Sequence, residues 1–387
     1  METEWIWLLL GLPIAFILGW LASRLDWRQM RIVQRSAPRA YFQGLTYLLN
    51  EQQDQAIDVF VQAVQSDPDT VELHFALGSL FRRRGEYDRA VRVHQHLLAR
   101  ADLSGLDRAR AQWELAQDFM KAGLLDRAEA SLQQLEGTSL ESQAQTALLY
   151  IYERTHDWPQ ALALTSRMTG EAAQAHGAGK QMHYLCEQAN DAMRQQDFER
   201  ATSLLDQARA CDSSGVRPGI EQVRLLLAQG QYRQAVQWAL ALSEQLPQTM
   251  PLLAGMWGDR VFETLQGDQA LLQQVHTALR VHYENESSLD VLLALVAIEH
   301  QMGLPRAGHW YAEHIRKHPS LVAAAHWMEL EQQQDAAIAK SLDKAMQPLL
   351  NYRCLHCGFE ARSYFWQCPG CQSWESFPTK RVEELQA

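Results

Sequence analysis

A short motif recurs along this chain about every 34 residues. Each copy has a turn, then an alanine, then an apolar stripe at helical spacing, as in RRGEYDRAVRVHQHLL at 83–98 and KAGLLDRAEASLQQL at 121–135. The alanines are Ala56, Ala90, Ala128, Ala161, Ala201, Ala235, Ala270 and Ala307, with separations of 34, 38, 33, 40, 34, 35 and 37 residues. Because one unit cannot bury its apolar face alone, this period predicts a stack of helix pairs and an all-α fold.

Further positions of the motif identify the type of repeat. Gly44 and Gly78 stand twelve residues before the first two alanines, and Phe60, Ala63 and Pro68 follow the first at +4, +7 and +12. These are tetratricopeptide positions, where small side chains let two helices cross closely. Larger side chains that fill the space beside the crossing stand three residues before their alanines: Tyr87, Leu125, Trp158, Phe198, Tyr232 and Leu304.

The pattern predicts a tetratricopeptide superhelix over residues 40–346. We expect about eight repeats and a capping helix over 321–346. The motif is strong through Ala235 and weaker around Ala270, where the sequence GDQA lacks the preceding aromatic residue.

The N-terminal region contains a long uncharged run. The nineteen residues from Trp5 to Ser23, WIWLLLGLPIAFILGWLAS, would form a helix of roughly 28 Å, about the thickness of a bilayer core. A cleaved signal peptide is the alternative, but it would begin with basic residues, whereas this chain begins with Glu2 and Glu4. We therefore expect residues 1–23 to be a single transmembrane anchor.

The charges after this run predict its orientation. Residues 24–39 contain five arginines and one acidic residue, Asp26, and the positive-inside rule places such a linker in the cytoplasm. The body of the protein is then cytoplasmic. The net charge of −11 over the whole chain argues against a general nucleic-acid binder, because phosphate binding needs a basic surface.

Four cysteines near the C-terminus have the spacing of a metal site. Cys354, Cys357, Cys368 and Cys371 form the pattern C-x2-C-x10-C-x2-C, which can supply four sulfurs to one tetrahedral ion. Disulfides are the alternative, but a cytoplasmic location keeps thiols reduced. The segment 350–378 is too short to have its own core, so metal binding would hold it folded.

The sequences CLHCG and CPGC resemble the metal-binding knuckles of rubredoxin, which leaves two metals to consider. Iron would make the ribbon a one-electron carrier, and zinc would make it structural. Two features favour zinc: the gap between the knuckles is short, and Gln372 replaces the glycine that usually follows the second knuckle. The sequence shows no flavin, nicotinamide or haem motif that would exchange electrons with iron. Four thiolates alone accept either metal.

Catalytic motifs are absent from the sequence. It has no P-loop, G-x-S-x-G, H-E-x-x-H or Rossmann glycine run, so we predict a binding protein and not an enzyme. The first helices of the repeats should line a concave surface on which arginines and aromatic residues could hold a partner. The candidate partner-binding residues are Phe75, Ser79, Arg82, Arg83, Trp113, Gln117, Asn190 and Arg194.

An N-terminal span, a tetratricopeptide array and a rubredoxin-like ribbon, in this order, resemble the lipopolysaccharide assembly protein B family of Gram-negative bacteria. Stretches such as AGLLDRAEASLQQL and YRCLHCGFEARSYFWQCPGCQSW look like that family's own. The resemblance covers essentially the whole chain and implies a single-pass protein of the inner membrane with a cytoplasmic body. It also implies that the four cysteines bind the metal and that the ribbon packs against the repeats.

The family resemblance also implies a function. Such a protein acts as an adaptor that presents the deacetylase of the committed step of lipid A synthesis to a membrane-anchored AAA+ metalloprotease. Other implied partners are further lipopolysaccharide assembly proteins and a lipid-sensing membrane regulator. A static scaffold for lipopolysaccharide enzymes needs the same anchor and groove, so the sequence leaves this alternative open, together with a rubredoxin-type electron carrier.

Overall fold

The computed structural model describes residues 20, 42–44, 46–47, 50, 52–66, 70–168, 178–212, 215–257, 265, 267–304, 308–331 and 335–386. Apart from Trp20, the predicted anchor and basic linker lie outside these residues. No helix in the described part of the chain is long and apolar enough to cross a bilayer. The chain divides into two compact units, Met1–Ile151 and Tyr152–Ala387, and each is described by itself.

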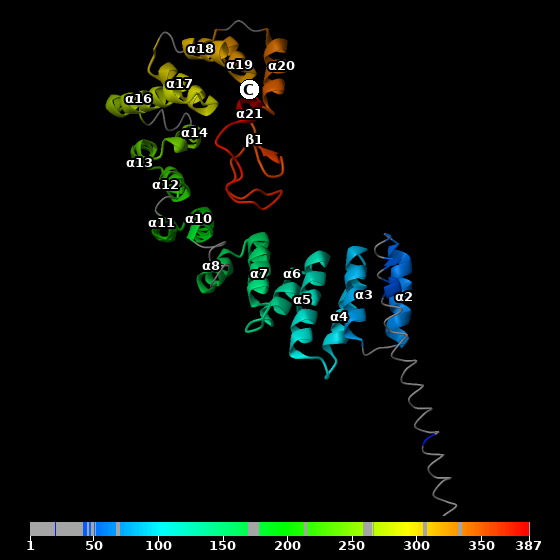
Figure 1. The fold of residues 1–387 in the computed structure, drawn as a ribbon. Coiled ribbons are helices and arrows are strands. Elements are labelled where there is room, and N and C mark those ends of the chain that lie inside the picture. The colour runs from blue at the N-terminus through cyan, green and yellow to red at the C-terminus, as the bar shows by residue number, and fades with distance from the viewer. Residues whose placement is uncertain are drawn as a thin grey trace, which may run out of the picture. The chain divides into compact units, whose positions relative to one another are not determined.

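The first unit consists of helices, and the first five described ones each pack against the next along the chain (Figure 1). They are α2 (Gln53–Ser66), α3 (Val71–Arg83), α4 (Tyr87–Leu98), α5 (Gly105–Ala122), α6 (Leu125–Gln133) and α7 (Glu141–Thr155), which ends in the second unit. Local sequence defines the ends of α5: the Ser104 side chain accepts a hydrogen bond from the Asp107 N–H, and Gly123 adopts a left-handed conformation with φ of 76°.

The second unit continues the helical array and ends in a small ribbon. Its helices are α8 (Trp158–Arg167), α10 (Ala178–Arg194), α11 (Phe198–Cys211), α12 (Arg217–Ala228), α13 (Tyr232–Gln245), η1 (Pro247–Thr249), α14 (Met250–Ala254), α16 (Gln269–Asn285), α17 (Leu289–Gln301), α18 (His309–Lys317), α19 (Leu321–Leu330) and α20 (Ala336–Met346). The ribbon contains β1 (Tyr352–Arg353) and β2 (Glu360–Ala361), and helix α21 (Val382–Gln386) follows it.

Six of the eight motif alanines occupy the predicted position. Ala56, Ala90, Ala128, Ala161, Ala201 and Ala235 are each the fourth residue of a helix, and none has any exposed surface. The glycines of the motif lie at crossings as predicted, since a Cβ on Gly78 would lie 2.4 Å from the His94 ring and one on Gly44 2.5 Å from the Phe60 ring. The small side chains therefore permit the close approach of the helices.

The predicted alignment is wrong at the seventh copy. Ala270 is the second residue of α16 and is exposed, and the buried fourth position is taken by Leu272. Leu304, expected to fill a crossing, is 40% exposed, and Ala307 lies outside the described residues. The physical reason is that Asp268 caps α16 by accepting a hydrogen bond from the Leu271 N–H, so the helix begins two residues later than the motif suggests.

Enlarging the two alanines tests this change of register. Ala235→Leu adds atoms to a crossing without free space and should lower the free energy of unfolding by about 1–3 kcal/mol. Ala270→Leu adds them at an exposed position and should change it by less than about 0.5 kcal/mol. Urea unfolding of the two variants checks this, and equal losses would contradict the register described here.

The C-terminal part of the array also differs from the prediction. Two helices, α19 and α20, occur where one capping helix over 321–346 was expected. One hydrophobic cluster joins α12–α19 to the ribbon, to which the ribbon contributes the buried residues Tyr352, Cys354, Trp366, Cys368 and Phe377. The ribbon therefore shares the core of the second unit.

Candidate metal centre

The two cysteine pairs lie in two adjacent turns. Strands β1 and β2 pair antiparallel, with Tyr352 opposite Ala361 and Arg353 opposite Glu360, and the first pair of cysteines lies between them. A bridge between Gln367 and Trp374 encloses the second pair. Each knuckle is thus the end of a short hairpin, which brings four sulfurs from 18 residues of chain together.

The distances between the sulfurs fit a tetrahedral metal site. All four Sγ atoms lie within 4.8 Å of one another, with 3.8 Å between Cys354 and Cys371 and 3.6 Å between Cys357 and Cys368. Four sulfurs bound to one zinc ion at about 2.3 Å would be about 3.8 Å apart. Disulfides would require about 2.0 Å. The geometry therefore fits a single metal ion and not two disulfides.

Backbone N–H groups surround the sulfurs in the same way in both knuckles. The Sγ of Cys354 accepts hydrogen bonds from the amides of His356 and Cys357, and the Sγ of Cys368 from those of Gly370 and Cys371. Donors at these positions stabilise thiolates, the form that binds metal.

The protonation of the four thiols also points to a cation. Burial acts to raise the pKa of Cys354, but the hydrogen bonds of Ser376 and of the backbone to its sulfur outweigh it, and this pKa falls to about 6. Burial raises the pKa of Cys368 to about 12. Because four adjacent sulfurs cannot all carry a negative charge without a cation, a bound metal ion would supply the charge that makes all four thiolates.

Gln372 shows how the ribbon tolerates its departure from rubredoxin. The residues after the two knuckles, Gly358 and Gln372, have φ of 78° and 63°. The left-handed conformation expected of glycine is therefore kept at Gln372, whose side-chain Nε2 donates to the Pro369 carbonyl at 3.3 Å. A missing glycine in the sequence does not change the backbone of the second knuckle.

Trp374 fixes the ribbon to the first helices of the second unit. Its Nε1 donates to Glu153 Oε1 at 3.2 Å, and its ring stacks on His183 of α10 with 4.7 Å between the centroids. Tyr184 and Trp158 meet the same indole edge-on, at 5.9 and 6.1 Å. A tryptophan enclosed in this way has the features of an interface anchor.

Arg217 lies beneath this contact and determines the state of His183. Its Nη2 donates to Glu187 at 2.6 Å and its Nη1 to His183 Nδ1 at 3.2 Å. Because a guanidinium only donates, His183 Nδ1 accepts, so the proton of the neutral ring lies on Nε2. This Nε2 is 3.2 Å from Glu375 of the ribbon.

Ribbon docking should weaken in mild acid. Burial lowers the pKa of His183, and the hydrogen bond from His183 lowers the pKa of Glu375. A group with a lowered pKa in the folded state stabilises fully above its unfolded value, about 6.5 for histidine, and this contribution is lost as the pH falls through the folded value. We expect the thermal unfolding midpoint of the second unit to drop between about pH 7 and pH 5.

The matched variants for this prediction are His183→Gln and His326→Gln. Glutamine at 183 can accept from Arg217 and donate to Glu375 without titrating, so the midpoint should depend less on pH. His326 is partly exposed and lies 3.5 Å from Glu329 on its own helix, and its replacement should keep the wild-type profile. If the unfolding midpoint of the His183→Gln variant depended on pH as strongly as that of the wild type, His183 would not be the group that weakens ribbon docking in acid.

A second set of contacts joins the ribbon to α17. The Arg381 guanidinium donates to Asp290 at 2.8 Å and lies 3.8 Å above the centre of the Tyr352 ring, and the Tyr352 hydroxyl donates to Asp290 at 3.1 Å. Asp290 is 6% exposed. This partly buried ion pair attaches the first strand of the ribbon to the start of α17.

Helix α21 caps two repeat helices. Glu383 accepts hydrogen bonds from the N–H groups of Leu321 and Val322 at 2.6 and 3.1 Å, and Glu384 accepts one from the Leu289 N–H at 3.0 Å. Carboxylates at helix N-termini satisfy free donors and interact favourably with the helix dipole. The starts of α19 and α17 therefore depend on residues that follow the ribbon.

The docking surface differs in extent from the sequence prediction. From the sequence, the aromatic residues of the ribbon predict an apolar side that docks onto the last helices, and these residues are Tyr364, Phe365, Trp366, Trp374 and Phe377. Trp366 and Phe377 are buried, Tyr364 and Trp374 are partly buried, and Phe365 remains 36% exposed. The surface also extends back to α7, α8, α10 and α12, through Trp158 of the repeat motif and through residues that no motif marks: Glu153, His183, Tyr184 and Arg217.

The candidate partner-binding residues lie in different environments. Phe75 is buried under Arg110, whose guanidinium lies 4.1 Å from the ring centre, and Arg82 is held by Glu114 and Asp118 at 2.5 and 2.7 Å. Ser79, Trp113, Gln117 and Asn190 are partly exposed, whereas Arg83 and Arg194 are exposed. Partner binding by these residues stays a prediction, although Arg82 already has two internal carboxylate partners.

Comparison with known proteins agrees with both parts of the structure. Residues 352–378 match a family described as a rubredoxin metal binding domain, and residues 73–109 match the tetratricopeptide repeat. Lipopolysaccharide assembly protein B of Escherichia coli is 32% identical over 401 residues, which cover 98% of this chain and 99% of that protein. The protein of the same name from Haemophilus influenzae is 28% identical, with 95% and 96% covered. Since this similarity includes both the repeats and the ribbon, the chain belongs to the lipopolysaccharide assembly protein B family.

Proposed function

We propose that the protein is an adaptor of the bacterial inner membrane that regulates lipopolysaccharide synthesis. It holds the deacetylase of the committed step of lipid A synthesis and presents it to a membrane-anchored AAA+ metalloprotease. The observation that carries the proposal is the similarity to lipopolysaccharide assembly protein B over 98% of the chain. Tetratricopeptide arrays serve as surfaces for protein partners, which supports an interaction role without catalysis.

Membrane attachment is part of this proposal. The uncharged run from Trp5 to Ser23 anchors the chain once, and the arginines of residues 24–39 keep the repeats and ribbon on the cytoplasmic side. Confinement to the plane of the protease raises the effective concentration of a bound client. The same location allows contact with other lipopolysaccharide assembly proteins and with a lipid-sensing regulator in the membrane.

The proposed metal is a zinc ion held by Cys354, Cys357, Cys368 and Cys371. Its role is structural, because the ribbon shares a core with the repeats and its tail caps α17 and α19. Iron in the same site would give a visible thiolate-to-iron absorption band and a reversible one-electron couple. Elemental analysis together with the absorption spectrum of protein purified from its own host distinguishes the two metals.

The lifetime of the deacetylase in the host tests the adaptor function. After depletion of this protein and arrest of protein synthesis, the deacetylase should persist several times longer than in the parent strain. A second substrate of the protease, followed in the same cells, should keep its normal lifetime. An unchanged deacetylase lifetime would instead support a static scaffold for lipopolysaccharide enzymes.

A further inference from the structure

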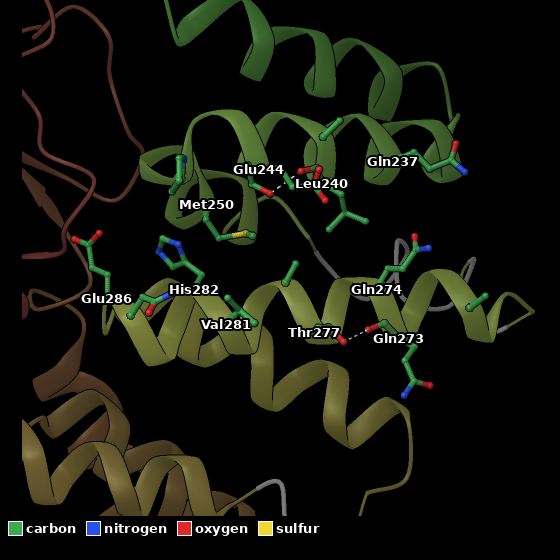
Figure 2. A pocket seen from close by; sticks show the side chains of 16 residues that line it. Gln237, Leu240, Glu244, Met250, Gln273, Gln274, Thr277, Val281, His282 and Glu286 are labelled. Carbon is green, nitrogen blue, oxygen red and sulfur yellow. Dashed lines mark hydrogen bonds between the residues drawn. The ribbon is translucent and has the colours of Figure 1, made fainter.

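The second unit contains an open groove between α13 and α16, and its lining shares no residue with the contacts of Trp374 and Arg381. Its volume is about 1050 Å³, and side chains from both helices and from the start of α14 line it (Figure 2). The groove lies where the repeat motif fails, since the exposed Ala270 is one of its lining residues. The small side chains of Ala241, Ala270 and Ala278 leave the space between the two helices open.

The groove has an apolar floor. Leu240, Met250 and Val281 point into it (Figure 2). Val281 is 48% exposed and Leu240 is partly exposed, whereas Met250 is buried. An apolar surface that is open to solvent along a groove is typical of a site where another protein binds.

One end of the groove is negative. Glu244 and Glu286 lie toward the ends of α13 and α16, which stop at Gln245 and Asn285, and the carbonyl ends of two helices add partial negative charge there (Figure 2). The lining residues that the structure describes include no lysine or arginine. Lys380 is 3.6 Å from Glu286, but both side chains are about half exposed, so this pair leaves most of the charge unbalanced.

His282 provides an unused hydrogen-bonding atom at the same end. The side chain is 9% exposed and points into the groove, and its Nε2 has no hydrogen-bond partner among the described residues (Figure 2). Burial lowers the pKa of His282, which keeps the ring neutral and leaves one nitrogen able to accept. An unpaired buried polar atom is destabilising, so a hydrogen-bond donor from a ligand would be stabilising at this position.

We infer that this groove binds an amphipathic α-helix of a partner protein. Aliphatic side chains of that helix lie on Leu240, Met250 and Val281, and a lysine or arginine near its N-terminus lies between Glu244, Glu286 and His282. The partner helix then runs antiparallel to α13 and α16, with the positive end of its dipole at the negative end of the groove. The inference holds equally for an adaptor and for a scaffold.

The dimensions of the groove agree with this occupant. Helices α13 and α16 contain 14 and 17 residues, so they extend about 21 and 26 Å. A 12-residue helix is about 18 Å long and, at a diameter of about 10 Å, occupies about 1,400 Å³. A groove of 1050 Å³ takes the apolar half of such a helix together with its anchoring side chains.

Selection of displayed peptides by the full-length chain tests the inference. The probe is a library of 14-residue peptides with leucine at helical spacing (i, i+3, i+4, i+7) and random residues elsewhere. We expect the enriched peptides to carry lysine or arginine in the first two turns. Replacing that cation by glutamate in the synthetic peptide should weaken binding at least tenfold, measured by fluorescence anisotropy.

Variants of the groove assign the binding site. Val281→Glu and Ala241→Trp are both at exposed positions. Each should weaken binding of the selected peptide at least tenfold without shifting the thermal unfolding midpoint of the protein. The double variant Glu244→Gln/Glu286→Gln should remove the preference for the cation. Glu284→Gln is the control, because Glu284 is exposed on α16 and pairs with Arg280 at 3.3 Å outside the lining; it should bind normally.

Three results would overturn the inference. The first is a selection in which no peptide is enriched over the starting library. The second is undiminished binding of the selected peptide by both Val281→Glu and Ala241→Trp. The third is a preference for the cationic peptide that persists in the double variant Glu244→Gln/Glu286→Gln. Sedimentation of the chain without peptide tests whether a second copy of this chain occupies the groove instead. If the wild type self-associates and Val281→Glu does not, the groove binds a second copy of this chain and not a partner helix.

Discussion

Replacing Cys354 and Cys357 by serine should release the metal and detach the ribbon from the repeats in one step. Structural zinc contributes apparent energies of about 10–16 kcal/mol to small metal-held folds, more than a ribbon of this size gains from its own core. Once the ribbon unfolds, Trp374 loses its contact with His183 and the carboxylates of α21 leave the starts of α17 and α19. The damage should therefore extend into the repeats.

Metal content and limited proteolysis measure this outcome. We expect no bound metal, rapid cleavage between residues 350 and 386, and new cleavage within α17 and α19. Cys211→Ser is the matched control, because Cys211 is partly exposed and outside the cluster, and it should keep its metal and wild-type cleavage. In the host, the cysteine variant should prolong the lifetime of the deacetylase as depletion does. A metal-free variant with a protected ribbon and normal client turnover would show that the metal does not hold this fold.

Arg217→Met should destabilise the second unit by about 3–5 kcal/mol. The side chain of Arg217 is 1% exposed and pairs with Glu187 at 2.6 Å and with the fully buried Glu221 at 3.5 Å. Removing one partner of a buried ion pair leaves the remaining charge uncompensated, which accounts for a cost of this size. The arginine also lies 5.4 Å from the Trp366 ring and 5.7 Å from that of Trp374, so ribbon docking should weaken at the same time.

Two further variants separate charge from packing at this position. In the Arg217→Met background the buried Glu221 keeps only the partly exposed Arg224, at 3.3 Å, as a partner, so Glu221→Gln in that background should recover part of the lost stability. Arg233→Met makes the same change at an exposed arginine, which pairs with the partly exposed Asp268 at 2.6 Å, and should cost less than about 1 kcal/mol. Denaturant unfolding followed by tryptophan fluorescence compares them. A similar loss for Arg217→Met and Arg233→Met would show that burial of the ion pair does not matter.

The features predicted from the sequence are those that depend on nearby residues. An alanine such as Ala90 is required where two successive helices cross, and its neighbours along the chain already contain the pattern. The four cysteines of the ribbon likewise fall within one short segment, so their spacing alone predicted the cluster of sulfurs. Ala270 shows the limit of the method, because a helix cap at Asp268 moved the helix start while the local motif stayed plausible.

The docking contacts could not be predicted because they join distant segments. Trp374 and Glu153 are 221 residues apart, and nothing in the sequence around either one indicates the other. Arg217 would be assigned to solvent by its residue type, since isolated arginines are mostly exposed. Its burial depends on carboxylates from α10 and α12 and on two tryptophans of the ribbon. Similarly, the sequence marks Arg82 as a candidate for partner binding but does not indicate its pairing with Glu114 and Asp118 of the next repeat.

The contact between Trp374 and Glu153 has a consequence for the order of folding. Repeat helices contact mainly their neighbours along the chain and can form early, whereas a contact that closes 221 residues requires a large loss of chain entropy. That contact also needs a folded ribbon, which depends on metal. We therefore expect the repeats to form first and the ribbon to dock last, so that metal supply, and not the speed of helix formation, determines when newly made protein matures. In metal-poor cells the population would contain chains with formed repeats and a protease-sensitive tail.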